Sequence, residues 1–230
     1  MDTNLSRLFT GFQTEKRFLF IRHGESRGNV DNIIQGRKNF RLTDKGRSQA
    51  KATGEWLKQI PAQSVFSSPL SRALETAQIA SHTAWGLDPE PWEELTELDT
   101  GIFSGLSVQE IQSKYPEQWK SFKENSWDTV KEAENRESLY ERCLQSWKKL
   151  AENAAAGADT QVCFTHAGTL KWIIYVSFGV RAWFPLVPTS NCGIYVLKVE
   201  PSKAERQTTP ISKWMLMDFQ APGIQTTPEV

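Results

Sequence analysis

Short apolar runs, most of them followed directly by polar residues, predict a series of strands. Phe18–Ile21 is a run of four consecutive apolar residues, and Ser64–Ser67 and Val162–Phe164 are similar short segments further along the chain. The segments Ile194–Val199 and Trp214–Phe219 predict two late strands. The first three segments are typical of strands in the buried part of a sheet.

Helix-type spacing appears between these strands. Thr43 is a suitable N-cap for one helix, and Ser68 followed by Pro69 predicts the start of a second. The second helix has one apolar face and carries Arg72 in its first turn, close to the end of the preceding strand. The apolar positions are Ala50, Gly54 and Leu57 in the first helix and Leu70, Ala73, Leu74, Ala77 and Ala80 in the second.

A longer, mainly helical stretch is predicted from Ser107 to Ala156. Ser107 and Glu110 suit a capping box at its start, and apolar side chains recur at helical spacing in its second half. A further helix is predicted to begin around Gly168, directly after the strand that ends near His166.

Strands that alternate with helices predict an α/β fold, a three-layer α/β/α sandwich with a mostly parallel central sheet. In such sheets ligands bind beyond the carboxyl ends of the strands. Arg22 and His23, Arg72, and His166 all follow predicted strands at that edge. We therefore expect these polar side chains, distant in sequence, to meet in one site.

Composition limits the classes of protein that remain. A chain of 230 residues, 39% of them hydrophobic, suits one domain, which we expect over residues 1–219, with residues 220–230 as a flexible tail. The 27 Lys and Arg residues balance the 27 Asp and Glu residues, so no global field favours nucleic acid or a membrane surface. No apolar run approaches the length of a signal peptide core or a membrane span, and we expect a cytoplasmic location.

The chemistry of the predicted site points to phosphoryl transfer. A transferring phosphoryl group spreads negative charge over its oxygens, so it needs several fixed donors around one in-line nucleophile. Arg22, Arg72 and His166 are such donors, and arginine grips two phosphate oxygens at once. A neutral imidazole is a suitable nucleophile, which makes His23 the candidate.

No carboxylate cluster, His-x-His motif or paired cysteine motif suggests a metal, so we predict neither a metal nor another cofactor.

These residues belong to a longer ordered pattern that resembles the histidine phosphatase superfamily, also called the phosphoglycerate-mutase-like family. The resemblance spans roughly residues 17–199, and its pieces occur in the family's order. The matching segments are Arg22-His23-Gly24-Glu25 with Asn29, Gln35-Gly36 and Leu42-Thr43-Asp44-Lys45-Gly46, then Ser67 to Ala77, then Leu95-Thr96-Glu97-Leu98-Asp99 with Gly101 and Gly105-Leu106, and finally Thr165-His166-Ala167-Gly168.

The resemblance implies a two-step mechanism through a phosphohistidine. His23 would attack phosphorus while Arg22, Arg72 and His166 hold the phosphoryl oxygens, and Glu97 would protonate the leaving alkoxide and later deprotonate water. Glu94 is the alternative proton donor, because alignment of a loop from one sequence is imprecise. The predicted substrate-binding residues are Arg22, Asn29, Gln35, Gly36, Arg72, His166 and Gly168.

The same first-step residues also fit a phosphoglycerate mutase. Related mutases carry a longer cap between the acid and the second histidine, whereas Glu97 and His166 are only 69 positions apart. We therefore favour a phosphatase acting on a small phosphorylated metabolite, with a cap at about residues 107–136. Trp119, Phe122 and Trp127 lie in it, either to line the substrate or to pack the cap.

A non-catalytic adaptor is less favoured, because no core residue of the pattern is missing. Homodimerisation is left open.

The loop after Gln35-Gly36 departs from the family pattern. Asn39 and Arg41 stand where related phosphatases commonly have aspartate and proline. Arg37, Lys38 and Arg41 either favour a substrate with extra negative charge or are ordinary solvated surface residues.

Overall fold

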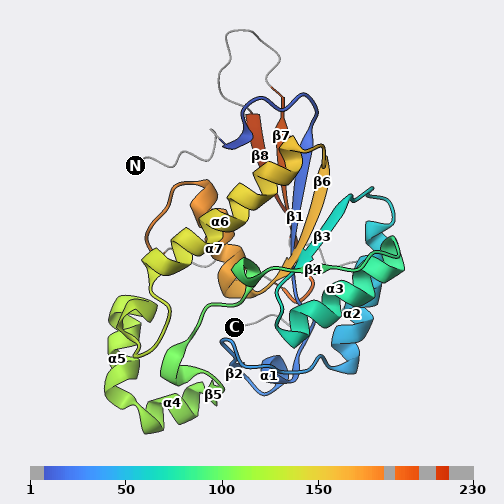
Figure 1. The fold of residues 1–230 in the computed structure, drawn as a ribbon. Coiled ribbons are helices and arrows are strands. Elements are labelled where there is room, and N and C mark those ends of the chain that lie inside the picture. Colours follow the sequence, from blue (N-terminus) through green and yellow to red (C-terminus); the bar gives the residue numbers. More distant parts are fainter. Residues whose placement is uncertain (1–7, 184–189, 202–210, 218–230) are drawn as a thin grey trace.

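The fold is built around one mixed sheet, most of whose neighbouring strands run parallel. The computed structural model describes residues 8–183 and 190–201, and the backbone of 211–217. The sheet has the order β4-β3-β6-β1-β7-β8 (Figure 1). The first four strands are parallel to one another, and β7 is antiparallel to both of its neighbours, β1 and β8. Its strands are β1 Lys16–Arg22, β3 Ser64–Ser67, β4 Glu90–Pro91, β6 Thr160–Thr165, β7 Ile194–Glu200 and β8 Ile211–Met217.

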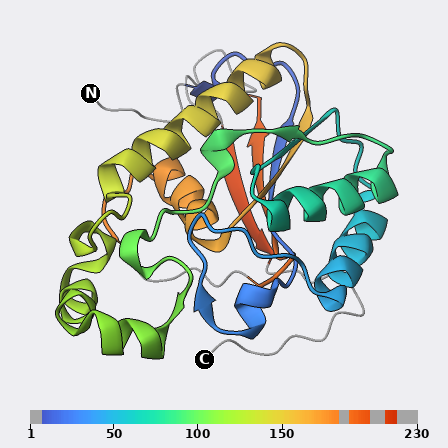
Figure 2. The same ribbon diagram turned by 60° about the horizontal axis from the view of Figure 1, so that its bottom comes forward.

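Helices cover both faces of this sheet, which gives the three layers predicted (Figure 2). On one side lie α2 and α3, and on the other lie α6 and α7. The helices are α1 Arg27–Val30, α2 Asp44–Leu57, α3 Ser71–Ala84, α4 Val108–Lys114, α5 Pro116–Asn125, α6 Arg136–Ala155 and α7 Ala167–Ser177.

The alternation of side chains along β1 explains why its central residues, Phe18–Ile21, are all apolar. Phe18 and Phe20 pack into the core beneath α6 and α7, whereas Leu19 and Ile21 pack into the core beneath α2 and α3. Successive side chains of a strand point to opposite faces, so a central strand covered on both sides must be apolar at every position.

The predicted helical stretch from Ser107 to Ala156 is confirmed as mainly helical, but it is divided. The capping box of Ser107 and Glu110 opens α4, and Pro116 begins α5 because proline suits the first turn of a helix. A 3-10 turn, Ser126–Thr129, and an irregular segment separate α5 from α6.

The cap has a small core of its own. Phe103, Ile111 and Val130 are buried at its centre, with Trp119, Phe122 and Trp127 among the residues packed around them. Of the two roles left open for these three aromatic residues, packing of the cap is therefore the one observed. The two-stranded sheet of β2 Ile33–Ile34 and β5 Leu106–Ser107 joins this cap to the N-terminal half of the chain (Figure 1).

Two element boundaries differ from the predictions. Helix α3 begins at Ser71 rather than at Ser68-Pro69, because Leu70 is still extended and the Ser68 hydroxyl accepts the Leu70 N–H at 3.2 Å. The last strand is β8, whereas residues 218–219 of the predicted strand and the predicted tail 220–230 lie outside the described residues.

Candidate active site

His23 lies directly after β1, where the chain leaves the sheet. Its Nδ1 is 2.7 Å from the Gly24 carbonyl oxygen, which only accepts hydrogen bonds, so Nδ1 carries the proton and Nε2 presents its lone pair. Burial and then the positive charges of Arg72 and Arg22 hold the pKa of His23 well below its ordinary value. The structure therefore presents a neutral imidazole with a defined tautomer.

Arg72 lies in the first turn of α3 with its guanidinium group against this imidazole. Its Nε donates toward His23 Nε2 at 3.3 Å, and its terminal nitrogens donate to the carbonyl oxygens of Lys38 at 2.8 Å and Gly36 at 2.9 Å. The side chain is 1% exposed, and burial lowers its pKa to about 10, which leaves it charged at neutral pH. The two carbonyl contacts fix the plane of the guanidinium group.

His166 is the N-cap residue of α7 and follows β6. The centroids of the His166 and His23 rings are 5.1 Å apart. His166 Nε2 lies 2.8 Å from the Ser68 hydroxyl, and its buried Nδ1 has no hydrogen-bond partner among the described residues. Burial and the nearby Arg72 charge hold the pKa of His166 well below its ordinary value, so this ring is also neutral.

Arg22 is the last residue of β1 and is buried. Its backbone N–H donates to the Gly193 carbonyl at 3.1 Å, and its carbonyl accepts from the Cys192 N–H at 3.1 Å. Its charge contributes to the lowered pKa of both His23 and His166. The four residues predicted to meet at the strand ends are therefore brought together.

Glu97 reaches the same end of the molecule from the loop before the cap. Its carboxylate accepts hydrogen bonds from the backbone N–H of Thr169 at 3.0 Å and of Gly168 at 3.3 Å, in the first turn of α7. A helix N-terminus offers unpaired N–H groups and a positive dipole end, which stabilise a carboxylate there. Gly168 is also predicted to contact the substrate; in the structure its N–H donates to the Glu97 carboxylate.

The alternative acid, Glu94, has a different environment. Its carboxylate forms an ion pair with Lys149 of α6 at 2.6 Å. Of the two acids, the structure thus ties Glu97 to the helix that His166 caps and pairs Glu94 with a lysine.

The other residues predicted to bind the substrate shape the loop between β1 and α2. The Asn29 amide oxygen accepts from the Ser26 N–H at 3.0 Å, and the Gln35 side-chain oxygen lies 2.9 Å from the Ser26 hydroxyl. Gly36 has a φ of +50°, and a Cβ there would clash with Thr100, so the position requires glycine. Its carbonyl holds Arg72, which gives Gly36 an observed role in orienting that guanidinium group.

Comparison with known proteins identifies the family of the chain. The profile of the histidine phosphatase superfamily (branch 1) matches residues 18–209. The chain belongs to the histidine phosphatase superfamily. The family suggested by the motifs is thereby confirmed, as is the α/β fold that the family shares.

The relatives of this superfamily member include phosphatases and mutases. Phosphoglycerate mutase-like protein 4 of Arabidopsis thaliana is 33% identical over 154 residues, 66% of each chain. The 2-carboxy-D-arabinitol-1-phosphatase of Triticum aestivum is 29% identical over 194 residues, 83% of this chain and 38% of the relative. The chain thus spans under two thirds of the length of these curated relatives. Phosphoglycerate mutase from Bacillus anthracis superposes with a TM-score of 0.73 at 20% identity, covering 92% of this chain and 96% of that one. These phosphatase and mutase relatives support the prediction that the chain is an enzyme.

Sequence reasoning missed several residues that support the site of this superfamily member. Thr76 accepts the Gly24 N–H at 3.0 Å, and Asn191 donates to the His23 carbonyl at 3.1 Å. Thr76 lies one helical turn after Arg72, so helical spacing was a signal for it. Ser68 was interpreted only as a helix start, and no motif surrounds Asn191.

The described residues contain neither a cluster of metal ligands nor a membrane-spanning helix. In those parts of the chain, no group of three or more His, Cys, Asp or Glu side chains is arranged to hold a metal ion. Within the same described residues, no helix is long and apolar enough to cross a bilayer.

Proposed function

We propose that this histidine phosphatase hydrolyses small phosphate monoesters through a phosphohistidine on His23. The observation that carries the proposal is the buried, neutral His23 ring, whose Nε2 lone pair lies 3.3 Å from a fixed guanidinium nitrogen. An incoming phosphate monoester is a dianion, and negative charge remains on its oxygens in the transition state. Its attack therefore requires a nucleophile with a cation beside it. The free Nδ1 of His166 supports the proposal, because buried polar atoms normally have a partner and a phosphoryl oxygen would supply one.

In the first step the Nε2 electron pair forms a bond to phosphorus as the bond from phosphorus to the ester oxygen breaks. Arg22, Arg72 and His166 stabilise the charge on the phosphoryl oxygens, and Glu97 in its protonated form gives its proton to the departing oxygen. In the second step Glu97 takes a proton from water as the water oxygen bonds to phosphorus. The bond from phosphorus to nitrogen then breaks, and inorganic phosphate and neutral His23 are released. We further propose that no metal takes part, because the arginines supply the positive charge.

Hydrolysis rather than mutase activity is proposed because of the cap. The segment between Glu97 and His166 is short, and the aromatic residues of the cap are engaged with Phe103. A mutase must keep water from the phosphoenzyme until the phosphoryl group returns to the substrate. Assays with 3-phosphoglycerate, scored separately for phosphate release and for isomerisation, distinguish the two reactions, and we expect phosphate release.

The experiment that tests the nucleophile is a rapid acid-free quench with labelled substrate on the wild type and on His23→Ala. We expect an acid-labile phosphoryl adduct on the wild-type His23 ring, and loss of both adduct and turnover in the variant. His82→Ala is the matched control, because His82 is an exposed histidine bonded to Asp88. Turnover that persists in His23→Ala would refute the proposal.

A further inference from the structure

The backbone around Glu97 is held by two arginines from other parts of the chain. Arg142 of α6 donates from one terminal nitrogen to the carbonyl oxygens of Glu94 at 2.9 Å and Thr96 at 2.7 Å. Arg37, from the loop after β2, donates from Nε to the carbonyl of Glu97 itself at 3.2 Å. The loop that carries the proposed acid is therefore fixed from two directions.

Both arginines bind one carboxylate, that of Glu134. Its Oε1 accepts from Arg142 Nε at 2.8 Å, and its Oε2 accepts from Arg142 at 2.8 Å and from Arg37 at 3.3 Å. The Oε2 atom also lies 3.4 Å from the Asp99 N–H. A bidentate arginine pair of this kind fixes orientation as well as distance.

The Glu134 side chain is only 8% exposed, and that of Arg142 is 14% exposed. Both partners are thus largely removed from water, where an ion pair holds its geometry better than on an open surface. The Glu134 N–H donates in turn to the Asp99 carbonyl at 2.9 Å, which ties the end of the cap to the acid loop. Glu134 therefore lies where the cap, the loop of Glu97 and α6 meet.

We infer that Glu134 is a positioning residue for Glu97. Through Arg142 and Arg37 it fixes the backbone on both sides of Glu97, so that the carboxyl group reaches the oxygen that leaves with the organic group. Glu134 does not touch the substrate in this scheme. The inference rests on the proposed function, because it concerns the proton transfer of the first step.

Glu134→Gln tests this role. Both carboxylate oxygens accept from guanidinium nitrogens, so an amide must turn its NH₂ group toward at least one of them. We expect phosphoenzyme formation from glycerol phosphate, whose alkoxide needs a proton to leave, to slow by about 10- to 100-fold. With dinitrophenyl phosphate, whose phenolate leaves without a proton, we expect less than about a threefold change. A loss of equal size on both substrates would refute the inference.

A double-variant comparison separates positioning from general damage. If Glu134 acts through Glu97, then Glu134→Gln adds no more than about a twofold loss on glycerol phosphate when Glu97→Gln is already present. Losses that multiply would contradict this route. Glu132→Gln is the matched control, because it removes a carboxylate from the same segment, whose only described ion pair is with the exposed Lys131 at 3.8 Å.

Arg37→Gln provides a second variant in case Glu134→Gln does not fold. It removes the contact to the Glu97 carbonyl and leaves the Arg142–Glu134 pair in place. We expect a smaller effect in the same direction, about 3- to 10-fold on glycerol phosphate with little change on dinitrophenyl phosphate. An unchanged ratio of the two rates would count against the inference.

The outcome also distinguishes failure of the inference from failure of the proposed function. If His23→Ala and Glu97→Gln behave as proposed while Glu134→Gln leaves the two-substrate ratio unchanged, then only the inference is wrong. If His23→Ala retains turnover, then the proposed function is wrong, whatever Glu134→Gln does.

Discussion

At the scale of single residues, the site depends on two buried histidines kept neutral. His23 and His166 are 3% and 0% exposed, and Arg72 and Arg22 lie close enough to affect both. Burial and neighbouring positive charge both disfavour a protonated imidazole. The same environment that leaves a lone pair on each ring therefore makes the folded protein a poor acceptor of protons.

This predicts that stability falls as the pH is lowered through the range where free histidine titrates. Both histidines have a folded-state pKa below the ordinary value of 6.5, so below that pH the unfolded chain binds protons that the folded protein does not. The contribution of these two histidines to the free energy of unfolding is fully present above about pH 7.5. It is lost toward pH 5.5, by up to about 1.4 kcal/mol per histidine for each pH unit. Urea unfolding across this range measures the slope.

The slope should shrink when one of these histidines is removed. His166→Ala should lower it by roughly half, whereas His82→Ala, which replaces an exposed histidine, should leave it unchanged. A slope that is the same in all three proteins would contradict the assignment of the pH dependence to the site.

At the scale of elements, the junction of β6 and α7 brings the acid and the second histidine together. His166 caps α7, and the N–H groups of Gly168 and Thr169 in its first turn bind the Glu97 carboxylate. A Cβ on Gly168 would lie 2.6 Å from Glu97 Oε1. Glycine at this position therefore leaves room for the carboxylate against the helix end.

Gly168→Ala should separate stability from activity. Alanine favours a helix over glycine by about 0.5–1 kcal/mol, which offsets the loss of the hydrogen bonds from Gly168 and Thr169 to Glu97, so we expect the melting temperature to change little. The new methyl group displaces the Glu97 carboxylate, so we expect the rate with glycerol phosphate to fall by about tenfold. Thermal unfolding and single-turnover kinetics measure the two effects. An additional loss of similar size in a Glu97→Gln background would contradict this explanation.

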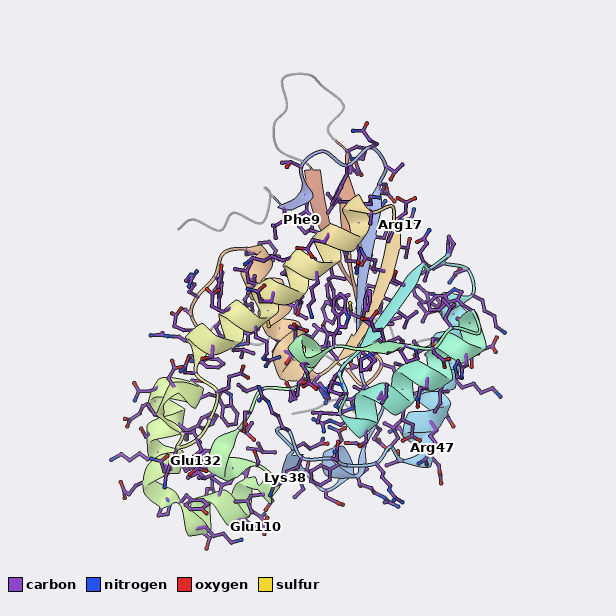
Figure 3. The ribbon with its side chains drawn as sticks, in the orientation of Figure 1. Phe9, Arg17, Lys38, Arg47, Glu110 and Glu132 are labelled. Carbon is purple, nitrogen blue, oxygen red and sulfur yellow. The ribbon has the colours of Figure 1, made fainter. Side chains whose placement is uncertain are left out.

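At the scale of the whole molecule, the cap is a second packing unit attached to the sheet. Figure 3 shows Glu110 and Glu132, which belong to the cap region, away from the sheet, whereas Arg17, at the start of β1, lies at the far end of the molecule from Lys38. The cap core centres on Phe103, which is fully buried and contacts the rings of Tyr115, Trp119, Phe122 and Trp127. We therefore expect that the cap can lose its order without loss of the central sheet.

Phe103→Ala tests this division. Removing a buried phenylalanine typically costs about 3–5 kcal/mol, and we expect that cost to fall on the cap. Hydrogen exchange should accelerate across residues 103–130, while the amides of β1 and β6 stay protected. Val108→Ala, at a cap position that is 39% exposed, is the control and should leave exchange unchanged. Uniform acceleration through β1 and β6 would show that the cap and the sheet unfold together.

Much of the architecture and of the site was predictable from local patterns. The central residues of β1, Phe18–Ile21, are all apolar because the strand is covered on both faces, and Thr43 and Ser107 are recognisable caps. His23 and His166 were predicted to meet because the carboxyl ends of parallel strands share one edge of a sheet. These features depend on neighbours along the chain or on a general rule of topology.

Other features needed the tertiary structure, because they depend on contacts between distant segments. The sequence by itself determined that the strand ends bring Arg22, His23, Arg72 and His166 to one edge of the sheet. It did not determine that His23 is neutral with its lone pair on Nε2, since that follows from burial, from the charges of Arg72 and Arg22, and from the contact of Nδ1 with the Gly24 carbonyl. Nor did it show that Gly168 serves Glu97 or that Glu134 joins Arg37 to Arg142, because hydrogen bonds across more than 70 positions leave no periodic signal in one sequence.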